Sequence, residues 1–372
     1  MTVAATAAAA EPPSVEAATD TAVGAGIPAI AVDGLWKLFG PSRAVRAAAT
    51  AIRQGADGAR AVADHGVFAA VAGVSLTVRR REILCVMGLS GSGKSTLVRH
   101  INGLVAPTLG GVRIDGRAVE GLSADQLREL RTTQVGMVFQ SASLFPHRTV
   151  LENVTFGLEV RGLPRAVREE RARDWLGRLH LRDAEDRFPT ELSGGMQQRV
   201  GLARTLVTDP DILLLDEPFS ALDPIIRRDL QAQFVTLCRE LDKTAVFITH
   251  DFEEALKVAD RIGVMVGGRL VQIGTPHEIL MRPATEQVAA FATDGLRRRH
   301  ARAGDLARPL TTGGEPAART RLPADAPLPV VLDALCEGEA AVAVVDAAGR
   351  VVGHLDRATV LRHLRHAVGD PD

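Results

Sequence analysis

Short runs of aliphatic residues alternate along the chain with longer segments whose apolar positions repeat with a helical period. The clearest runs are residues 83–87, 212–215 and 244–249, each followed by a polar or glycine-rich turn and a helix-like stretch. Strands without polar interruption suit burial on both faces, and alternation of strands with helices is typical of a parallel sheet flanked by helices. The pattern therefore predicts an α/β fold with a mainly parallel core sheet.

The remaining elements of this region follow from the same pattern. Strands are expected at residues 29–32, 71–78, 110–115, 134–139, 261–266 and 270–273, and helices at residues 94–102, 225–241 and 252–258. Residues 150–181 have a helical pattern in which Arg and Glu are interleaved with Leu, Val and Trp175. In a parallel sheet the loops at the carboxyl ends of the strands are where a ligand is expected to bind.

Residues 88–95 read Gly-Leu-Ser-Gly-Ser-Gly-Lys-Ser and fit the pattern G-x-x-x-x-G-K-[ST]. They follow a predicted strand and open a predicted helix, so glycine-rich backbone N–H groups and a helix N-terminus can converge on phosphates. The expected nucleotide-binding residues are Gly88, Ser90, Gly91, Ser92, Gly93, Lys94, Ser95 and Thr96. Lys94 would reach the β- and γ-phosphates and Ser95 would ligate Mg²⁺, so the chain is expected to bind a nucleoside triphosphate.

Composition limits the possible partners and compartments. The 372 residues include 44 basic and 45 acidic side chains, a balance that argues against a general nucleic-acid binder. Cys85, Cys238 and Cys336 are widely spaced without a C-x-x-C pair, so we expect reduced cysteines that act as apolar fillers. No run of about 18 uncharged apolar residues predicts a membrane span. Residues 1–28 lack the pattern of a signal peptide and are expected to form a disordered extension.

Further motifs follow in a fixed order. Residues 192–199 read LSGGMQQR, residues 212–217 read ILLLDE, Gln140 follows Val138-Phe139, residues 220–223 read SALD, and His250 follows the run 244–249. Together with the phosphate loop, these motifs resemble those of the ATP-binding cassette family, the ATPase subunits of ABC transporters. The resemblance covers roughly residues 29–293. It implies a P-loop NTPase cassette with a mainly parallel core sheet, an antiparallel β subdomain and a helical subdomain at roughly residues 141–200.

The resemblance implies a role for each motif residue in ATP hydrolysis. Asp216, with Ser95 and Gln140, is expected to hold Mg²⁺, and Glu217 is expected to orient and polarise the attacking water. Gln140 would also report nucleotide occupancy to the helical subdomain, and His250 would contact the γ-phosphate. Glu217, His250 and Gln140 are therefore the expected catalytic residues.

The LSGGMQQ segment implies that one chain does not complete the site. In the family, Ser193, Gly194, Gly195 and Gln197 face the γ-phosphate bound by the opposite subunit, and they use a helix N-terminus as the anion site. Asp223 would carry communication across the interface. A head-to-tail homodimer that encloses ATP and Mg²⁺ between its subunits is therefore expected.

Two assignments stay open at this point. The family stacks adenine on an aromatic ring near the first strand; the chain has no tyrosine, so Phe39 is the candidate and Phe68 the rival, and either ring can equally be a core residue. Residues 143–147 read Ser-Leu-Phe-Pro-His and lie where importers contact a coupling helix of the membrane permease. Leu144 and Phe145 can equally pack internally.

Two features resemble a narrower group, the ATPases of glycine betaine, proline and choline importers. One is the Ala- and Arg-rich insertion at residues 40–66, although this segment can also be a surface helix without a functional role. The other is the amino-acid sequence of residues 87–94, MGLSGSGK, and of residues 219–224, FSALDP. The resemblance implies import through separate permease subunits with an extracytoplasmic solute-binding protein. It also implies a peripheral location on the cytoplasmic face of the inner membrane. The solute itself cannot be chosen from these residues.

The sequence changes character after Phe291. Residues 294–323 contain a basic cluster, Gly and Pro, and are expected to form a linker beyond the cassette at residues 29–293. Residues 324–366 follow with a helical pattern at 329–335, strands at 341–346 and 351–355, and a helix at 357–364. This order resembles one CBS repeat, a regulatory module that betaine importers carry as a tandem pair. Only one repeat is recognisable, so a sensing role stays open.

The main alternative is a non-transport ABC ATPase of the DNA-repair, chromosome or translation type. Chromosome-type members insert a very long coiled coil between the phosphate loop and LSGG, and translation-type members usually carry two cassettes. This sequence has neither feature. A small-molecule kinase with the same P-loop would have no need of the LSGG segment, so transport is the favoured interpretation.

Overall fold

The computed structural model describes residues 26–220, 222–292, 300–309, 320–336, 339 and 341–360. The chain divides into two compact units, and the boundary along the sequence falls between Pro276 and His277. Most of the predicted N-terminal extension, residues 1–28, lies outside the described residues. None of the helices in the described ranges is both long and apolar enough to cross a bilayer.

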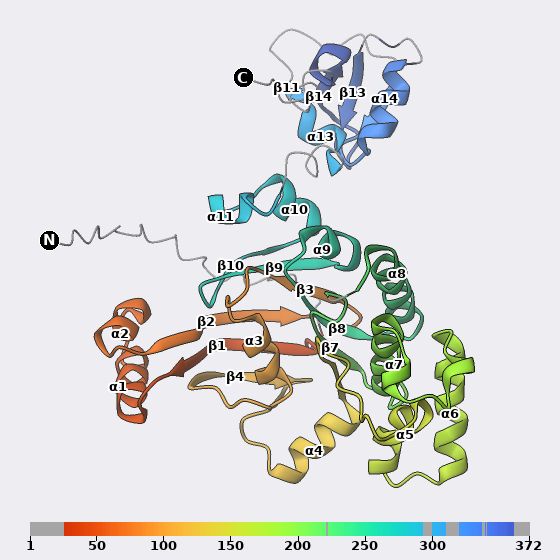
Figure 1. The fold of residues 1–372 in the computed structure, drawn as a ribbon. Helices are drawn as coiled ribbons and strands as arrows, with labels where there is room; N and C mark the ends of the chain where they lie inside the picture. Colours follow the sequence, from red (N-terminus) through yellow and green to blue (C-terminus); the bar gives the residue numbers. More distant parts are fainter. Residues whose placement is uncertain are drawn as a thin grey trace, which may run out of the picture. The chain divides into compact units, whose positions relative to one another are not determined.

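A six-stranded sheet forms the centre of the first unit (Figure 1). Its strand order is β10-β9-β3-β8-β7-β6, and all neighbours are parallel except β9 and β10. The strands are β3 (Ile83–Met87), β6 (Val135–Val138), β7 (Ile212–Asp216), β8 (Thr244–Thr249), β9 (Arg261–Val266) and β10 (Arg269–Gly274). Every residue of β3, β7 and β8 is buried, as the uninterrupted aliphatic runs predict for strands covered on both faces.

A second, antiparallel sheet has the order β2-β1-β4-β5. Its strands are β1 (Ile30–Phe39), β2 (Phe68–Val78), β4 (Leu109–Ile114) and β5 (Arg117–Ala118). Helix α3 (Lys94–Ile101) packs between this sheet and the central one: Leu97 and Val98 join residues of both sheets in one hydrophobic cluster. This packing fixes the phosphate loop, which precedes α3, relative to both sheets.

Helices form most of the segment between β6 and β7, and the three longest, α5, α6 and α7, are labelled in Figure 1. They are α5 (Val150–Val160), α6 (Arg165–Arg178) and α7 (Gly194–Leu206), with the short 3-10 turns η1 (Arg182–Ala184) and η2 (Pro189–Glu191). The helical pattern predicted across residues 150–181 is broken at Gly162, which has a φ of +76°. Helix α5 begins with a capping box between Thr149 and Glu152.

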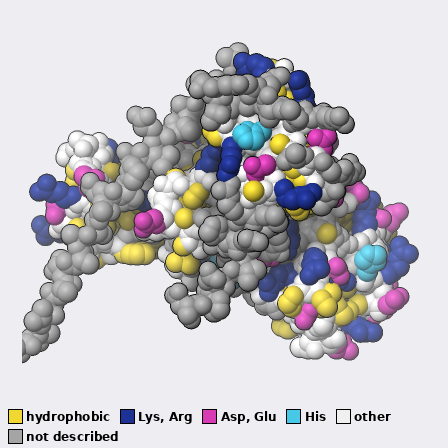
Figure 2. All heavy atoms as spheres, turned by 90° about the horizontal axis from the view of Figure 1, so that it is seen from above, with side chains coloured by type: hydrophobic (Ala, Val, Ile, Leu, Met, Phe, Trp, Pro, Cys, Tyr) yellow, Lys and Arg dark blue, Asp and Glu magenta, His cyan; other side chains and the backbone are white. Residues whose placement is uncertain are grey.

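Basic and acidic side chains alternate along α6, where Arg165 and Arg173 pair with Glu169, and Arg178 pairs with Asp174. In the space-filling view, charges of both signs are interspersed on the visible face of this part of the molecule (Figure 2). Exposed i,i+4 pairs of this kind contribute only tenths of a kcal/mol each, so burial of Ala172 and Leu176 is what holds α6 in place.

The remaining helices of the first unit are α1 (Ser42–Arg53), α2 (Gly58–Asp64), α4 (Ala124–Thr133), α8 (Pro224–Glu240) and α9 (Phe252–Val258). The 40–66 insertion thus forms two helices, α1 and α2, and not one. They build a small core with Leu38 and Val67, and Gly58 lies so close to the Trp36 indole that a side chain there would collide with it.

Cys85 and Cys238 are buried as expected, and burial raises the pKa of the Cys238 thiol to about 12. The side chain of Cys336 lies outside the described residues.

The second unit is described by itself. It begins within α10 (Pro276–Met281) and contains α11 (Glu286–Ala289), α13 (Ala303–Leu306), α14 (Leu328–Cys336) and a sheet of order β11-β14-β13-β12. The strands are β11 (Arg308–Pro309), β12 (Arg321–Pro323), β13 (Ala341–Val345) and β14 (Val351–Asp356). Helix α13 and strands β11 and β12 fall inside the segment predicted as a linker, residues 294–323, so part of that segment is folded. Ala303 is fully buried in one hydrophobic cluster with residues of α14, β13 and β14, so α13 packs within the second unit. The predicted helix 357–364 is described only as far as residue 360.

Candidate functional site

The phosphate loop connects β3 to α3. Gly88 and Gly93 have φ values of +154° and +98°, and a Cβ at either position would overlap a backbone carbonyl oxygen, that of Met265 or of Ala70. Only glycine combines these dihedrals with so close an approach. Ser92 accepts a hydrogen bond from the backbone N–H of Gly268 at its carbonyl oxygen, 3.1 Å away, so the loop is anchored to the β9–β10 turn.

Lys94 is the first residue of α3 and is almost completely buried. Its ammonium donates hydrogen bonds to the carbonyl oxygens of Gly88 at 2.8 Å and Leu89 at 3.0 Å. Burial lowers the pKa of this ammonium, while the nearby Glu217 and Asp216 carboxylates act in the opposite direction. The loop therefore curls around a positive charge that lies beside two carboxylates.

Asp216 ends β7 and lies next to Ser95, one residue after Lys94. The Ser95 hydroxyl donates to Asp216 Oδ1 over 2.7 Å. Both side chains line a cavity of about 540 Å³, which Gln140 also lines. Hydroxyl, carboxylate and amide oxygens are ligands that Mg²⁺ accepts, so the three residues expected to hold the metal share one space.

Glu217 has an unusual backbone conformation for a residue with a side chain, with a φ of +46°. Its N–H donates to the Ile248 carbonyl of β8 at 3.1 Å, and its carboxylate pairs with His250 Nδ1 at 3.0 Å. The Glu217 side chain is 18% exposed and that of His250 is 56% exposed. A left-handed residue held between two buried strands is a type of strain that is found at functional sites.

Gln140 follows β6 and contacts two other motifs. Its Nε2 lies 3.5 Å from the Ser220 hydroxyl, and its backbone carbonyl accepts a hydrogen bond from the buried Gln198 Nε2 at 2.7 Å. Ser220 in turn donates to the Glu217 carbonyl at 3.0 Å. Gln198, one residue beyond the predicted LSGGMQQ contacts, thus positions the Gln140 backbone and was not singled out from the sequence.

Ser193 is the N-cap of α7 and accepts the N–H of Met196. Gly194 and Gln197 line the same 540 Å³ cavity as Ser95. Gly195 packs against Ile226, and Gln197 donates to the Pro189 carbonyl at 2.9 Å. Asp223 caps α8 by accepting the N–H of Ile225 at 2.9 Å.

Phe39 and Phe68 are cross-strand partners at the ends of β1 and β2. They are 48% and 62% exposed, so neither is a core residue. The Lys37 ammonium lies 5.3 Å from the centre of the Phe39 ring and covers one of its faces. Of the other predicted contacts, Ser90 and Gly91 are exposed at the tip of the loop, while Thr96 is half-buried in the first turn of α3.

The loop at residues 143–147 is held by a buried asparagine that the sequence did not single out. Asn153 accepts the N–H of Phe145 and donates to the carbonyls of Phe145, Arg148 and Thr149. The Phe145 ring lies 4.7 Å from that of Phe156 and is half-buried, as is Leu144. Leu144 and Phe145 are thus half-buried, which does not decide between internal packing and a contact with the permease.

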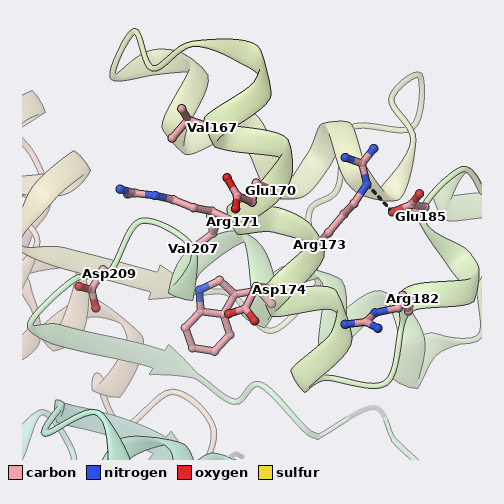
Figure 3. A pocket seen from close by; sticks show the side chains of 10 residues that line it. Val167, Glu170, Arg171, Arg173, Asp174, Arg182, Glu185, Val207 and Asp209 are labelled. Atoms are coloured by element: carbon pink, nitrogen blue, oxygen red, sulfur yellow. Dashed lines mark hydrogen bonds and ion pairs between the residues drawn. The ribbon is translucent and has the colours of Figure 1, made fainter.

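A larger hollow of about 1050 Å³ lies away from these motifs (Figure 3). Its wall is formed by α6, the η1 region and the segment after α7, and it is lined by charges of both signs, with Arg173 and Glu185 paired across it at 3.1 Å. None of its lining residues belongs to the predicted site. We assign it no part in nucleotide binding.

The fold and the site together define a P-loop nucleotide-binding protein with a strand-end carboxylate beside the loop. Residues 71–220 match the family model described as ABC transporter. The chain is 46% identical over 333 residues to the trimethylamine N-oxide transport system ATP-binding protein TmoW of Ruegeria pomeroyi, covering 89% of this chain and 96% of that protein. The chain therefore belongs to the ABC transporter family as an ATP-binding subunit, and it is an ABC-type ATPase.

A second curated relative and a solved structure support the same family assignment. The glycine betaine transport ATP-binding protein OpuAA of Bacillus subtilis is 52% identical over 232 residues, a match that spans 62% of this chain and about half, 53%, of that protein. Among solved structures, the ATP-binding cassette MJ0796, as a dimer in a post-hydrolysis state bound to ADP and Pi, superimposes with a TM-score of 0.57 at 30% identity. The superimposed region covers 66% of this chain and 98% of the MJ0796 chain. The cassette fold predicted from the sequence is confirmed.

Proposed function

We propose that this chain powers import of a small quaternary amine or compatible solute, of the glycine betaine, proline or choline type, by hydrolysing ATP. The observation that carries the ATPase part is the joint placement of Ser95, Asp216 and Gln140 on one cavity beside Glu217 and His250. The solute class is supported by relatives whose names specify trimethylamine N-oxide and glycine betaine transport. The non-transport alternative is not favoured, since these relatives are transport subunits.

Each motif residue has a role in this proposal. The phosphate loop, residues 88–96, would bind the triphosphate with Lys94 at the β- and γ-phosphates. Ser95, Asp216 and Gln140 would hold Mg²⁺, which when bound neutralises phosphate charge. Glu217 would orient the attacking water, and His250, already paired with Glu217, would contact the γ-phosphate. Phe39 would stack on adenine.

We further propose a nucleotide-sandwich homodimer. Ser193, Gly194, Gly195 and Gln197 would reach the γ-phosphate of the partner, and Asp223 would transmit the contact. Support comes from the open space beside the N-terminus of α7, where a Cβ on Gly194 would meet no atom within 4 Å, and from the dimeric state of the similar MJ0796 cassette. Permease subunits and an extracytoplasmic solute-binding protein would complete the complex, at the cytoplasmic face of the inner membrane.

The permease is proposed to contact residues 143–147. These residues leave the Gln140 motif and are braced by Asn153, so a shift of Gln140 would be passed to the surface there. Nucleic acid has no place in the proposed complex, given the balanced net charge of −1.

The proposed division of the chain is an extension at residues 1–28, the cassette at 29–293 with its helical subdomain at 141–200, a linker at 294–323 and a CBS-like module at 324–366. The order β12, α14, β13, β14, with β12 and β13 parallel, supports a single CBS-like repeat. Strands β11 and β12 of the same sheet would then belong to the module as well, although they precede residue 324.

The proposal is tested by uptake of labelled betaine, choline and proline in cells that carry this chain with a cognate permease and binding protein. We expect accumulation of at least one of them with the natural chain and none with Lys94→Ala. If none of the three accumulates in a Lys94-dependent way while purified protein still hydrolyses ATP, the solute class is wrong. If the purified protein has no Lys94-dependent ATPase activity, the ATPase role itself is wrong.

A further inference from the structure

One arginine on α8 contacts two motif loops at once. Arg227 donates through one terminal nitrogen to the carbonyls of Ser220 at 3.1 Å and Leu222 at 3.0 Å. Its other terminal nitrogen lies 3.7 Å from Asp251 Oδ2, next to His250. The Arg227 guanidinium therefore sits between the SALD segment and the segment that carries His250.

A second contact between α8 and the His250 segment lies one helical turn further on. Gln231 donates to Glu254 Oε1 at 2.8 Å, and the other oxygen of Glu254 accepts the Thr249 hydroxyl. Thr249 also accepts the Asp251 N–H at 2.9 Å. Thr249, Gln231 and Glu254 are 1%, 4% and 5% exposed, so this polar cluster is shielded from water.

Residues at i and i+4 lie on the same face of a helix, so Arg227 and Gln231 contact the His250 segment from the same face of α8. Arg227 contacts Asp251, and Gln231 contacts Glu254. His250 is thus flanked by Thr249 and Asp251, and both are tied to α8. Within the buried cluster, each oxygen of Glu254 accepts one hydrogen bond, so breaking the bond from Gln231 or from Thr249 leaves a buried polar group without that partner and favours one arrangement.

We propose that Arg227 and Glu254 are positioning residues that hold the SALD segment and His250 as one unit on α8. A displacement of residues 220–223 would then move His250 relative to Glu217. The proposal rests on the ATPase role of the site, and it adds a link inside one chain between the segment expected at the dimer interface and the histidine expected at the γ-phosphate. Neither residue contacts the reacting atoms.

The guanidinium geometry explains why arginine is needed. One planar group reaches two carbonyls and a carboxylate in different directions, which the point charge of a lysine cannot do. Arg227→Lys therefore keeps the positive charge but loses the planar guanidinium, whereas Arg227→Met removes both. Arg228, the exposed next residue on α8, provides the matched control as Arg228→Met.

The first test measures ATPase kinetics of the full chain. We expect Arg227→Met and Arg227→Lys to lower kcat by about 10- to 100-fold, as small misplacements of catalytic groups do, with ATP binding and KM within about twofold of the natural chain. Arg228→Met should leave both constants unchanged. Equal losses in kcat and nucleotide affinity for Arg227→Met would overturn the proposal, since they indicate general damage to the site.

A double-mutant cycle with His250→Ala asks whether Arg227 acts through the histidine. If it does, Arg227→Met has little further effect once His250 is gone, so the two losses are not additive. Additive losses in kcat would overturn the proposed link. Lys94→Ala reports separately on the ATPase role, since activity that survives this change indicates that hydrolysis is not at this site.

Amide hydrogen exchange provides a readout that needs no turnover. We expect Arg227→Met, and Glu254→Gln as a second variant, to speed exchange in residues 249–254 and 220–223 while peptides from β3 and β7 stay protected. Unchanged exchange in both segments would overturn the proposal even where the variants are folded and inactive. If Arg227→Met does not fold, Arg227→Lys and Glu254→Gln decide the outcome by the same criterion.

Discussion

The Ser95 hydroxyl lies 2.7 Å from the Asp216 carboxylate, although the two residues are 121 positions apart in the chain. Ser95 is fixed by the first turn of α3, and Asp216 by the last residue of β7. Because β3, β8 and β7 are parallel neighbours in the sheet, the carboxyl ends of β3 and β7 and the loop after β3 lie at the same edge. The contact joins the phosphate-binding and metal-binding halves of the proposed site.

Removal of that hydroxyl tests the proposed metal site. We expect Ser95→Ala to bind ATP without Mg²⁺ nearly as well as the natural chain, and to lose most of the gain in affinity and turnover that Mg²⁺ provides. Ser95→Thr keeps a hydroxyl in the pattern G-K-[ST] and should retain both. Titration of Mg²⁺ at fixed ATP measures the effect, and an unchanged Mg²⁺ dependence in Ser95→Ala would show that the hydroxyl is no ligand.

The aromatic pair at the ends of β1 and β2 offers two candidates for adenine. We expect Phe39→Ala to weaken ATP binding by about 1–3 kcal/mol, the usual value of one base stacked on an aromatic ring. Phe68→Ala should have a smaller effect, because the Lys37 ammonium at 5.3 Å stabilises the orientation of Phe39 alone.

Inorganic tripolyphosphate, which has no base, is the control ligand for these two variants. Its binding should be unchanged in both and lost in Lys94→Ala, which separates stacking from phosphate contacts. A larger loss of ATP affinity in Phe68→Ala than in Phe39→Ala would assign the platform to Phe68.

The sequence predicted the bounds of three mainly aliphatic strands and of one short amphipathic helix. The bounds of β3, β8, α9 and β9 agree with the expected ranges 83–87, 244–249, 252–258 and 261–266. Helix α4 was not predicted: Leu130 is its one buried residue, so its sequence has almost no apolar period. Strand β5 is two residues long and is defined by its pairing with β4, which leaves no local signal.

The phosphate loop conformation yields a stability prediction. Gly93 has a φ of +98°, and a Cβ there would overlap the Ala70 carbonyl oxygen. We expect Gly93→Ala to lower the free energy of unfolding by about 1–3 kcal/mol, measured by urea denaturation without nucleotide.

Gly121→Ala is the matched control, because a Cβ there would meet no atom within 4 Å. Its free energy of unfolding should stay close to that of the natural chain. Equal stability of Gly93→Ala and Gly121→Ala would mean that the loop relaxes without cost.

The sequence did not predict the residues whose side chains hydrogen-bond to backbone carbonyls of the motif loops. Gln198 holds the carbonyl of Gln140, Asn153 holds the loop at Phe145, and Arg227 holds the carbonyls of Ser220 and Leu222. A carbonyl acceptor is present at every position of a chain, so its partner leaves no residue pattern to find. The motif residues, by contrast, were placed correctly relative to strands and helices because each motif ends or begins an element.

The buried Glu254 carboxyl predicts a specific pH dependence. Burial raises its pKa above the ordinary value, against the opposing hydrogen bonds from Thr249 and Gln231. Between the ordinary and the raised pKa the folded chain holds a proton that the unfolded chain has released. The contribution of Glu254 to stability is therefore present below the ordinary pKa and is lost as the pH rises through the raised one.

Glu254→Gln does not titrate, so it should gain stability relative to the natural chain as the pH rises above that of an ordinary carboxyl, by at most about 1.4 kcal/mol per pH unit. Urea unfolding from pH 5 to 8 measures the difference. Glu253→Gln, at an exposed position of the same helix, should show no such trend. A difference between Glu254→Gln and the natural chain that does not change with pH would contradict the argument.

The central claim is that two copies of this chain enclose ATP between them and that Glu217 is required to hydrolyse it. The most direct test is the mass in solution of Glu217→Gln, measured by light scattering with and without ATP and Mg²⁺. We predict a monomer without nucleotide, a dimer with ATP and Mg²⁺, and no phosphate release. A variant that stays monomeric with ATP, or that releases phosphate at the natural rate, would contradict the account.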